Sequence, residues 1–335
     1  MSTQQAVWLP GIGQDFSVGP REIDAPGPGE LLVKIISSSL NPLDWKIQET
    51  GFFFIKSYPA VIGEEAAGTV EAVGEGVTDF KEGDRVFFQA NMGSNEFATF
   101  QQYCIVVADL AAKIPENKTF DQAASVQIGI IPFAVALYAQ QPQGLAHLAP
   151  WIEGGNGKYT GQPIVIMGGA SSVGQYSIQL ARLSGFSPII TTASLHNAEL
   201  LSSLGATHVL DRKLSTTALK DAIVKITSIP ITLVFDAISL PGTQQTAHDI
   251  LTTGGTKSED KVLHPVFGSF HEPPNRELGK SFMPVLTQWL ADGTIKPNFV
   301  EVVPGGLNGV SSGLQRLKNN LVSGKKLVVR PWETA

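Results

Sequence analysis

The sequence predicts an α/β protein in which a strand-rich domain is combined with a doubly wound parallel sheet. Two patterns lead to this prediction. Short apolar runs separated by turn residues fill the first 128 residues, and further along the chain short apolar strands alternate with amphipathic segments of helix length. A strand, a small-residue turn and a helix also follow one another between Pro163 and Gly185. With 335 residues, the chain has the length of about two domains.

The N-terminal part is expected to form a barrel or a sandwich of strands, because its apolar residues alternate between turn signals. The expected strands are 29–40, 68–77, 84–90 and 96–107. From residue 120 the pattern changes to Ala-rich helical spacing, which extends to residue 141 and is followed by a polar loop over 141–162. This change of composition predicts a domain boundary near residue 129.

The central part predicts βαβ units on a parallel sheet. Its expected strands are 163–169, 188–193, 208–211, 231–237 and 261–268. The last stretch returns to mixed character and predicts two helices, over 282–295 and 307–321, before a closing strand at 325–330.

Composition excludes several classes of protein. The formal net charge is -6, so no general cationic surface is available to attract nucleic acid. Cys104 is the only cysteine, which rules out an internal disulfide and multi-thiolate metal sites and favours a reducing compartment. The apolar run from Ile128 to Ala139 contains Pro132 and is shorter than the roughly 20 residues of a membrane span. The first residues lack the pattern of a secretory signal. We therefore expect a soluble, cytoplasmic protein.

The small-residue turn is a candidate dinucleotide site. A pyrophosphate needs backbone N–H groups at a helix N-terminus with no side chain in the way, and this segment provides a strand, a tight turn and a helix. The glycine fingerprint is degenerate, because Ser171 stands at the middle glycine position, where its hydroxyl either adds a hydrogen bond or hinders approach. A tight βα connection without a ligand is the alternative. The candidate cofactor-binding residues of the turn are Gly169, Ser171, Ser172, Val173 and Gly174.

The next strand indicates which dinucleotide would bind. Ser194 stands 20 residues after Gly174, near the position where NAD-binding proteins usually carry an acid for the ribose 2′-hydroxyl. Neutral hydrogen-bonding residues follow it, including His196 and Asn197, and they tolerate a 2′-phosphate. Arg212, or Lys213 beside it, would add positive charge. NADPH is therefore favoured over NADH; the alternative interpretation of these residues is a solvated loop.

Several segments, in this order along the chain, resemble the zinc-free branch of the medium-chain dehydrogenase/reductases, which includes quinone oxidoreductases, alkenal reductases and fungal trans-acting enoyl reductases. They are SSLNPLDWK (38–46), YPAVIGEEAAGTVEAVGEGVTDFKEGDRVF (58–87), GGASSVGQYSIQLARLSG (168–185), ASLHNAELLSSLGATHVLDR (193–212), VFDAIS (234–239), DGTIKPN (292–298) and KKLVV (325–329). The resemblance covers essentially the whole chain. It implies a GroES-like catalytic domain formed by residues 1–128 and 276–335, and a Rossmann NADPH-binding domain at 129–275. It also implies a reaction site in the cleft between these domains.

The resemblance implies that no zinc is bound. Zinc-dependent relatives hold a catalytic metal with Cys, His and acidic ligands. Where their Cys ligand is expected, this chain has the segment 41–44, and their GHE motif is replaced by Gly63, Glu64 and Glu65. Without a Lewis acid, oxidation of an ordinary alcohol is difficult, whereas hydride addition to an activated C=C bond needs only hydrogen-bond donors and a proton.

Lys46 is the first candidate for catalysis, because a lysine in this loop would donate to an enolate or to the nicotinamide ribose. The alternative is an exposed lysine. Tyr58 is the second candidate and, with the cluster Phe52, Phe53 and Phe54, would wall the substrate pocket, although aromatic clusters are more often simple core. The further positions expected near the cofactor are Asn41, Asp44, Gln127, Ile128, Ile238, Ser239, Val266, Phe267 and Gly268. Asp44 is expected to cap the helix that follows it, and Pro42 to stiffen the loop.

Glu64 and Glu65 have the chemistry of an acid/base pair, but the simpler interpretation is an ion pair or hydrogen bond that supports the turn. The leading hypothesis is thus a zinc-independent NADPH-dependent reductase of enals, enones, enoyl thioesters or quinones. A quinone-specific reductase and a non-catalytic NADPH-binding or sensing protein are the alternatives, while an NAD-linked alcohol dehydrogenase is disfavoured by the missing zinc ligands and by Ser194. A polyketide synthase is a candidate partner, and the chain is expected to be a monomer or a homodimer.

Overall fold

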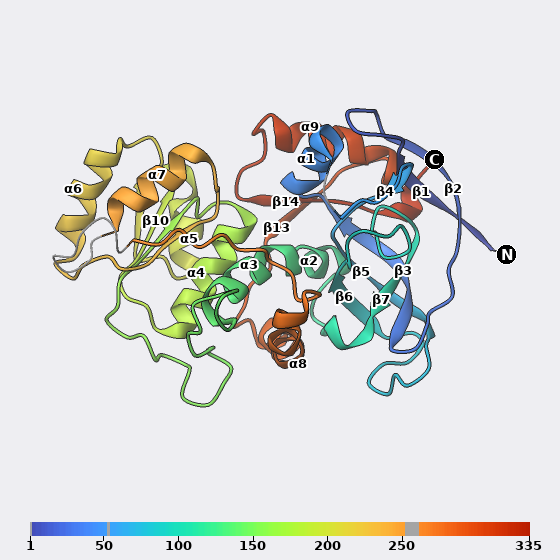
Figure 1. Cartoon of the computed structure of the whole chain (residues 1–335), viewed down its shortest axis with the longest axis horizontal. Coiled ribbons are helices and arrows are strands. Elements are labelled where there is room, and N and C mark those ends of the chain that lie inside the picture. Colours follow the sequence, from blue (N-terminus) through green and yellow to red (C-terminus); the bar gives the residue numbers. More distant parts are fainter. Residues whose placement is uncertain (1, 52–53, 252–260) are drawn as a thin grey trace. The chain divides into compact units, whose positions relative to one another are not determined.

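The computed structural model describes residues 2–51, 54–251 and 261–335 and divides into two compact units. Unit 1 consists of Met1–Ile128 and Gly279–Ala335, and unit 2 consists of Gly129–Leu278. Figure 1 shows that the N-terminal strands, in blue, and the C-terminal strand, in red, belong to the same unit. Both ends of the chain therefore build unit 1, and the middle of the chain builds unit 2.

Unit 1 is formed mainly by antiparallel strands. One sheet has the order β2-β1-β4, and a larger one has the order β13-β14-β3-β5-β6-β8, with β7 also paired to β3. The strands are β1 Thr3–Leu9, β2 Ser17–Glu22, β3 Glu30–Ser39, β4 Ala60–Val61, β5 Glu65–Val73, β6 Arg85–Gln89, β7 Tyr103–Val107, β8 Ala111–Lys113, β13 Phe299–Val302 and β14 Lys325–Val329.

Alternation of apolar side chains positions the central strand β3. Leu31, Val33 and Ile35 point to one face and are fully buried in a core that also contains Cys104. The end of β3 pairs antiparallel with β14, Ser39 lying opposite Val328. This pairing places the last strand of the chain beside the loop that follows β3.

Unit 1 also contains helices. They are α1 Pro42–Thr50, α2 Phe120–Ala124, α8 Arg276–Asp292, which begins at the end of unit 2, and α9 Gly309–Lys318. Two of them, α1 and α2, begin with a capping box. In α1 the N-cap is Asn41 and Pro42 occupies the first turn. Asp44, which the sequence assigned to the cap itself, lies three residues further on and accepts a hydrogen bond of 2.7 Å from the backbone N–H of Asn41.

Unit 2 contains a parallel sheet with helices. Its strands are β9 Ile164–Met167, β10 Ile189–Ala193, β11 His208–Asp211 and β12 Val234–Asp236, in the order β11-β10-β9-β12. Its helices are α3 Gln127–Tyr138, which starts at the end of unit 1, α4 Ser172–Ser184, α5 Ala198–Leu204, α6 Thr216–Ile226 and α7 Pro241–Ile250. Every strand pair of this sheet is parallel, as the βαβ pattern predicted. The α/β fold class is confirmed.

The segment 261–268, predicted as a further strand, is not a strand, and that prediction is wrong. Pro265 has no N–H for a strand ladder. The ring Nε2 of His264 instead lies 2.9 Å from the carbonyl oxygen of Gln143, and Gly268 packs closely against Pro132 of α3. Val266 and Phe267 therefore lie on an extended segment without strand pairing.

The helical stretch Phe120–Tyr138 is long and apolar enough to cross a membrane by composition, but 72% of it is buried inside the protein. It consists of α2 and α3, and α3 continues through Pro132. Burial of this kind is typical of the core helix of a globular protein.

Candidate functional site

The small-residue turn of unit 2 lies where the strand order of the parallel sheet reverses. β9 ends at Met167 and has β10 on one side and β12 on the other. In open α/β sheets, ligands bind at the carboxyl ends of the strands at such a switch point. Gly168 adopts a φ of 76°, which favours glycine, and the N–H of Gly169 donates to the carbonyl oxygen of Thr192 at 2.9 Å.

The turn leads directly into helix α4. Ser171 is its N-cap: its Oγ accepts from the N–H of Gly174 at 3.0 Å and donates to the carbonyl oxygen of Gly168 at 2.8 Å. The sequence left open whether the Ser171 hydroxyl adds a hydrogen bond or hinders a ligand. In the structure it forms two hydrogen bonds that stabilise the turn. Ser172 and Val173 form the first turn of α4, where backbone N–H groups have no acceptor within the helix.

Two glycines are required by close packing. A Cβ at Gly174 would lie 2.3 Å from the carbonyl oxygen of Gly168, and one at Gly169 would lie 2.1 Å from Thr191 Oγ1. Larger residues would push the turn away from the strands. This turn has the shape that a dinucleotide pyrophosphate requires, and its residues fit such a group.

The ends of β10 and β11 bring the predicted ribose-side residues together. The N–H of Arg212 donates to the carbonyl oxygen of Ala193, so Arg212 lies next to Ser194. Arg212 and His196 are exposed, and Asn197 is buried with its Nδ2 3.2 Å from His196 Nε2. Asp211, Arg212 and Lys213 thus share this edge of the sheet with several neutral hydrogen-bonding groups.

Of the other positions predicted near the cofactor, Ile238 lies closest to the turn: a Cβ on Gly168 would come 2.4 Å from its Cδ1. Ile238 is 38% exposed, and Ser239 follows it with a φ of 55°. Phe267 is 37% exposed and Val266 is half-buried.

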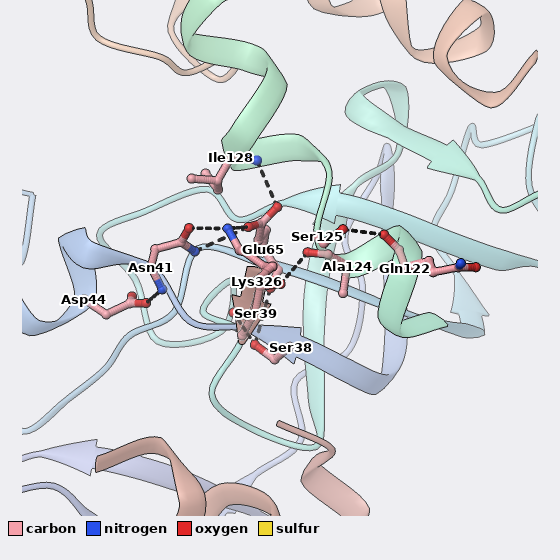
Figure 2. A network of polar contacts seen from close by, with 11 residues as sticks. Ser38, Ser39, Asn41, Asp44, Glu65, Gln122, Ala124, Ser125, Ile128 and Lys326 are labelled. Carbon is pink, nitrogen blue, oxygen red and sulfur yellow. Dashed lines mark hydrogen bonds and ion pairs between the residues drawn. The ribbon is translucent and has the colours of Figure 1, made fainter. Parts of the chain in front are cut away.

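Unit 1 contains a buried charge cluster, which we define as Asp44, Glu64, Glu65 and Lys326. Lys326 Nζ lies 2.6 Å from Glu65 Oε1 and 2.6 Å from Asn41 Oδ1, as Figure 2 shows. Both side chains of the ion pair are almost fully buried, with 5% and 1% exposure. A buried ammonium needs such partners, because desolvating an unpaired charge is costly.

Glu65 also holds the start of α3. Its Oε2 accepts from the backbone N–H of Ile128 at 2.9 Å, and its Oε1 lies 3.4 Å from Asn41 Nδ2. Beside Ile128, Gln127 donates from Nε2 to the carbonyl oxygen of Phe87 at 3.1 Å. Glu65 and Gln127 therefore stabilise the backbone, which agrees with the simpler interpretation of the glutamate pair for Glu65.

The other two carboxyls have raised pKa values. Burial raises the pKa of Asp44 to about 8, opposed by the hydrogen bond from Asn41 and by the charge of Lys326. Burial also raises the pKa of Glu64 well above its ordinary value, and the neighbouring Asp44 adds to the effect. The cluster therefore combines one ion pair with two carboxyls that favour the neutral form.

A pocket of about 350 Å³ opens beside Glu64 in unit 1. This volume is typical of small-molecule sites. Its apolar lining residues include Ile47, Phe54, Ile55, Val61, Ile62 and Met92. Its polar and charged lining residues include Arg21, Lys56, Ser57, Glu64, Asn95 and Glu96. The pocket therefore offers both an apolar wall and several polar or charged groups to a small molecule.

The predicted catalytic residues are found in unit 1. Lys46 is exposed on α1, with Nζ 5.8 Å from the ring centre of Trp45, and Tyr58 is half-buried against an apolar core. Neither is among the described residues that line the pocket. Phe54 does line it, whereas Phe52 and Phe53 lie outside the described residues.

Sequence reasoning missed Lys326 and the pocket. The sequence did contain a signal for Lys326, because two adjacent lysines begin the closing strand 325–330. Successive side chains of a strand point to opposite faces, so in a strand inside the sheet one of the two lysines must point into the protein. Lys325 is exposed and Lys326 is buried. Within residues 2–51, 54–251 and 261–335, no group of three or more His, Cys, Asp or Glu side chains has the geometry of a metal site.

The comparisons with known proteins agree with this architecture. Residues 27–116 match the alcohol dehydrogenase GroES-like domain, and residues 172–258 match the zinc-binding dehydrogenase family. The chain is 33% identical to the trans-enoyl reductase himH of Aspergillus japonicus, covering 97% of this chain and 96% of that protein. It is 31% identical to the trans-enoyl reductase resD of Aspergillus sclerotiorum, covering 97% and 99%. It is also 33% identical to the dehydrogenase azaJ of Aspergillus niger, covering 98% and 99%.

Solved structures show the same fold. The human synaptic vesicle membrane protein VAT-1 homolog-like protein superimposes with a TM-score of 0.78 at 20% identity, covering 100% of both chains. The quinone oxidoreductase from Coxiella burnetii gives a TM-score of 0.74 at 21% identity, covering 98% of this chain and 99% of that one. The chain belongs to the medium-chain dehydrogenase/reductase family. It is therefore an oxidoreductase of a family whose members use nicotinamide cofactors.

Proposed function

We propose that this protein is a zinc-independent, NADPH-dependent reductase of activated C=C bonds, acting on enals, enones, enoyl thioesters or quinones. The observation that carries the proposal is the position of Lys326 Nζ, 2.6 Å from both Asn41 and Glu65, in a unit that also holds a small pocket of mixed polar and apolar lining. The names of the trans-enoyl reductase relatives support reduction of an enoyl group.

The proposal that the reaction needs no zinc rests on the positive charge of Lys326. The segments 41–44 and 63–65 stand where the resemblance places metal ligands in zinc-dependent relatives, and here the ammonium group of Lys326 lies between Asn41 and Glu65 of these segments. A divalent cation at the same place would meet a fixed positive charge at contact distance. These residues do not fit a zinc ion, so hydrogen-bond donors have to stabilise the charge that develops on the substrate.

The cofactor proposal rests on unit 2. The bound reduced nicotinamide would supply a hydride to the substrate. First-turn N–H groups of α4 would hold the pyrophosphate, since the turn carries no side chain larger than serine before Val173. Arg212, with Ser194 and His196 beside it, would bind a ribose 2′-phosphate, and an acid that would repel this group is missing from position 194. NADPH is therefore proposed in preference to NADH.

The chain's residues have separate tasks in the proposed reaction. The apolar wall that includes Phe54 and Met92 would bind the substrate's hydrocarbon part and exclude water. Lys46 is proposed to donate to the enolate or to the nicotinamide ribose, and Tyr58 to support the pocket wall. A carrier-bound intermediate of a polyketide synthase remains a proposed substrate source, and we propose a cytoplasmic monomer or homodimer.

A substrate panel tests the proposal. NADPH oxidation is measured with crotonaldehyde, methyl vinyl ketone, crotonyl-CoA and benzoquinone, each with and without a chelator, and NADPH binding is followed by fluorescence. We expect turnover of at least one compound and no effect of the chelator. Binding of NADPH without turnover of any compound would instead support a non-catalytic NADPH-binding protein. Reduction of benzoquinone alone would indicate a quinone-specific reductase.

A further inference from the structure

Glu64 combines deep burial with a free acceptor atom at the wall of the pocket. Glu64 is one of the residues that line the pocket, it is only 3% exposed, and its buried Oε1 has no hydrogen-bond partner among the described residues. The backbone at Glu64 is fixed, because its carbonyl oxygen accepts from the N–H of Ala90 at 2.7 Å. Gly63 before it has a φ of 109°, and a Cβ there would lie 2.6 Å from Thr99 Oγ1.

The surroundings of Glu64 disfavour its charged form. Lys326 is engaged by Glu65 and Asn41 at 2.6 Å, and none of the ion pairs among the described residues includes Glu64. Burial raises the pKa of the Glu64 carboxyl well above its ordinary value, and the nearby Asp44 raises it further. A neutral carboxylic acid is a hydrogen-bond donor, and an apolar site is where proteins keep such an acid protonated for that purpose.

We propose that Glu64 is a catalytic residue that donates its carboxyl proton to the carbonyl oxygen of the substrate in this pocket. The inference rests on the proposed function, because it concerns the same reduction. When a hydride adds to the β-carbon, the electron pair of the C=C bond moves toward the carbonyl oxygen. The O–H bond of Glu64 breaks as a new O–H bond forms on the substrate, which becomes an enol. Water then returns a proton to Glu64, and the enol becomes the saturated carbonyl compound in solution.

The charges around Glu64 set the pH range of this role. The groups that act on it from the packed elements are Asp44 of α1, Glu65 of β5 and Lys326 of β14, and the charged groups of the pocket wall are Arg21, Lys56 and Glu96. Because the protonated form is the donor, activity is expected to fall as the pH rises through the pKa of Glu64.

Two substitutions at one position test the proposal, with an exposed glutamate on the strand that follows Glu64 as the control. Glu64→Leu removes the donor, whereas Glu64→Gln keeps a neutral donor that does not titrate. We expect Glu64→Leu to lower kcat with crotonaldehyde by about 100-fold or more, the effect of losing one donor to a developing oxyanion. Glu64→Gln keeps a hydrogen-bond donor but has no acidic proton to transfer, so it should also lower kcat, by less than Glu64→Leu does, and lose the decline at high pH. Glu71→Leu and Glu71→Gln, at an exposed position of β5, should match the wild type.

The outcome that overturns the inference is a Glu64→Leu variant whose kcat and pH profile equal those of the wild type. A second readout needs no turnover. In infrared difference spectra against Glu64→Gln, the protein without cofactor should show a protonated carboxyl at neutral pH, and its band should shift when butanone, a saturated ketone, is added. Absence of that band contradicts the inference even if Glu64→Leu is unstable. If the wild type reduces no compound of the panel, the proposed function fails, and the infrared result still tests Glu64 separately.

Discussion

Adjacent residues of identical type differ in chemistry here because their neighbours differ. Glu65, the first residue of β5, is paired with Lys326, whereas Glu64 just before the strand lines a pocket and forms no ion pair with any residue that the structure describes. Successive side chains of an extended chain point to opposite sides, which separates the two carboxyls. The sequence showed the pair but could not assign the partners, because Lys326 lies in the last strand and packs with residues such as Asn41, 285 positions away.

Because Lys326 belongs to a buried ion pair, we expect its substitution to destabilise the protein much more than substitution of the neighbouring Lys325. Lys326→Met leaves Glu65 as a buried charge without its partner, and we expect the free energy of unfolding to fall by about 3–5 kcal/mol. Lys325→Met removes only a pair at the surface, with Lys325 Nζ 3.3 Å from Glu301, and should cost about 0–1 kcal/mol. Chemical denaturation of both variants measures the difference. Equal stabilities would contradict the description of the cluster, and adding Glu65→Gln to Lys326→Met should recover much of the loss.

Asp44 predicts a pH dependence of stability. Burial raises its pKa in the folded protein to about 8, against an ordinary value of 3.8. Between these values the folded protein holds a proton that the unfolded chain has released, so this residue lowers the free energy of unfolding as the pH rises. Asp44→Asn keeps an oxygen that can accept from the Asn41 N–H but does not titrate.

We therefore expect the Tm of Asp44→Asn to depend less on pH than that of the wild type, and to exceed it near pH 8. Thermal unfolding across this range measures the effect. Asp79→Asn, at an exposed position, should follow the wild-type curve. A Tm of Asp44→Asn that falls with pH as steeply as the wild type would contradict the assignment.

At the scale of elements, the β9 strand, its turn and α4 were the most predictable part of the fold. An apolar strand, small residues that permit a tight turn and an amphipathic helix all agree locally, so distant contacts were not needed to identify them. The segment 261–268 was predicted wrongly because its apolar residues resemble a strand, while Pro265 removes a ladder donor. The strands β1 and β2 were not predicted, since their mixed composition gives little signal.

Substitutions in the turn after β9 and at the end of β11 should change the affinities for NADPH and NADH in different ways. Gly174→Ala forces a Cβ into the space 2.3 Å from the Gly168 carbonyl oxygen, and should weaken NADPH and NADH alike by about tenfold or more. Arg212→Ala should weaken NADPH by about tenfold and leave NADH unchanged, because only NADPH carries a 2′-phosphate. Fluorescence titration measures both affinities, and Lys225→Ala on α6 serves as the surface control. Equal weakening of the two nucleotides by Arg212→Ala would contradict the assigned 2′-phosphate position.

At the scale of the whole molecule, the predicted α/β fold class and the predicted membership of the medium-chain dehydrogenase/reductase family are confirmed, whereas the zinc-free branch stays a prediction. The two compact units meet in the chain after Ile128 and after Leu278. The boundaries predicted from the sequence lie after residues 128 and 275. The pocket could not be predicted, because it is formed by three separate segments around residues 21, 47–64 and 92–98, and no local pattern connects them. Roles assigned to Lys46 and Tyr58 stay predictions.

The most direct test of the central claim follows the position of a single deuterium. The protein is incubated with NADPH deuterated on the transferred position, with methyl vinyl ketone and with a chelator, and the product is examined by mass spectrometry and NMR. The account predicts butanone with one deuterium on the β-carbon, formed at the same rate with and without the chelator. Deuterium on the carbonyl carbon of an alcohol, or a reaction that stops with the chelator and resumes with added zinc, would contradict it.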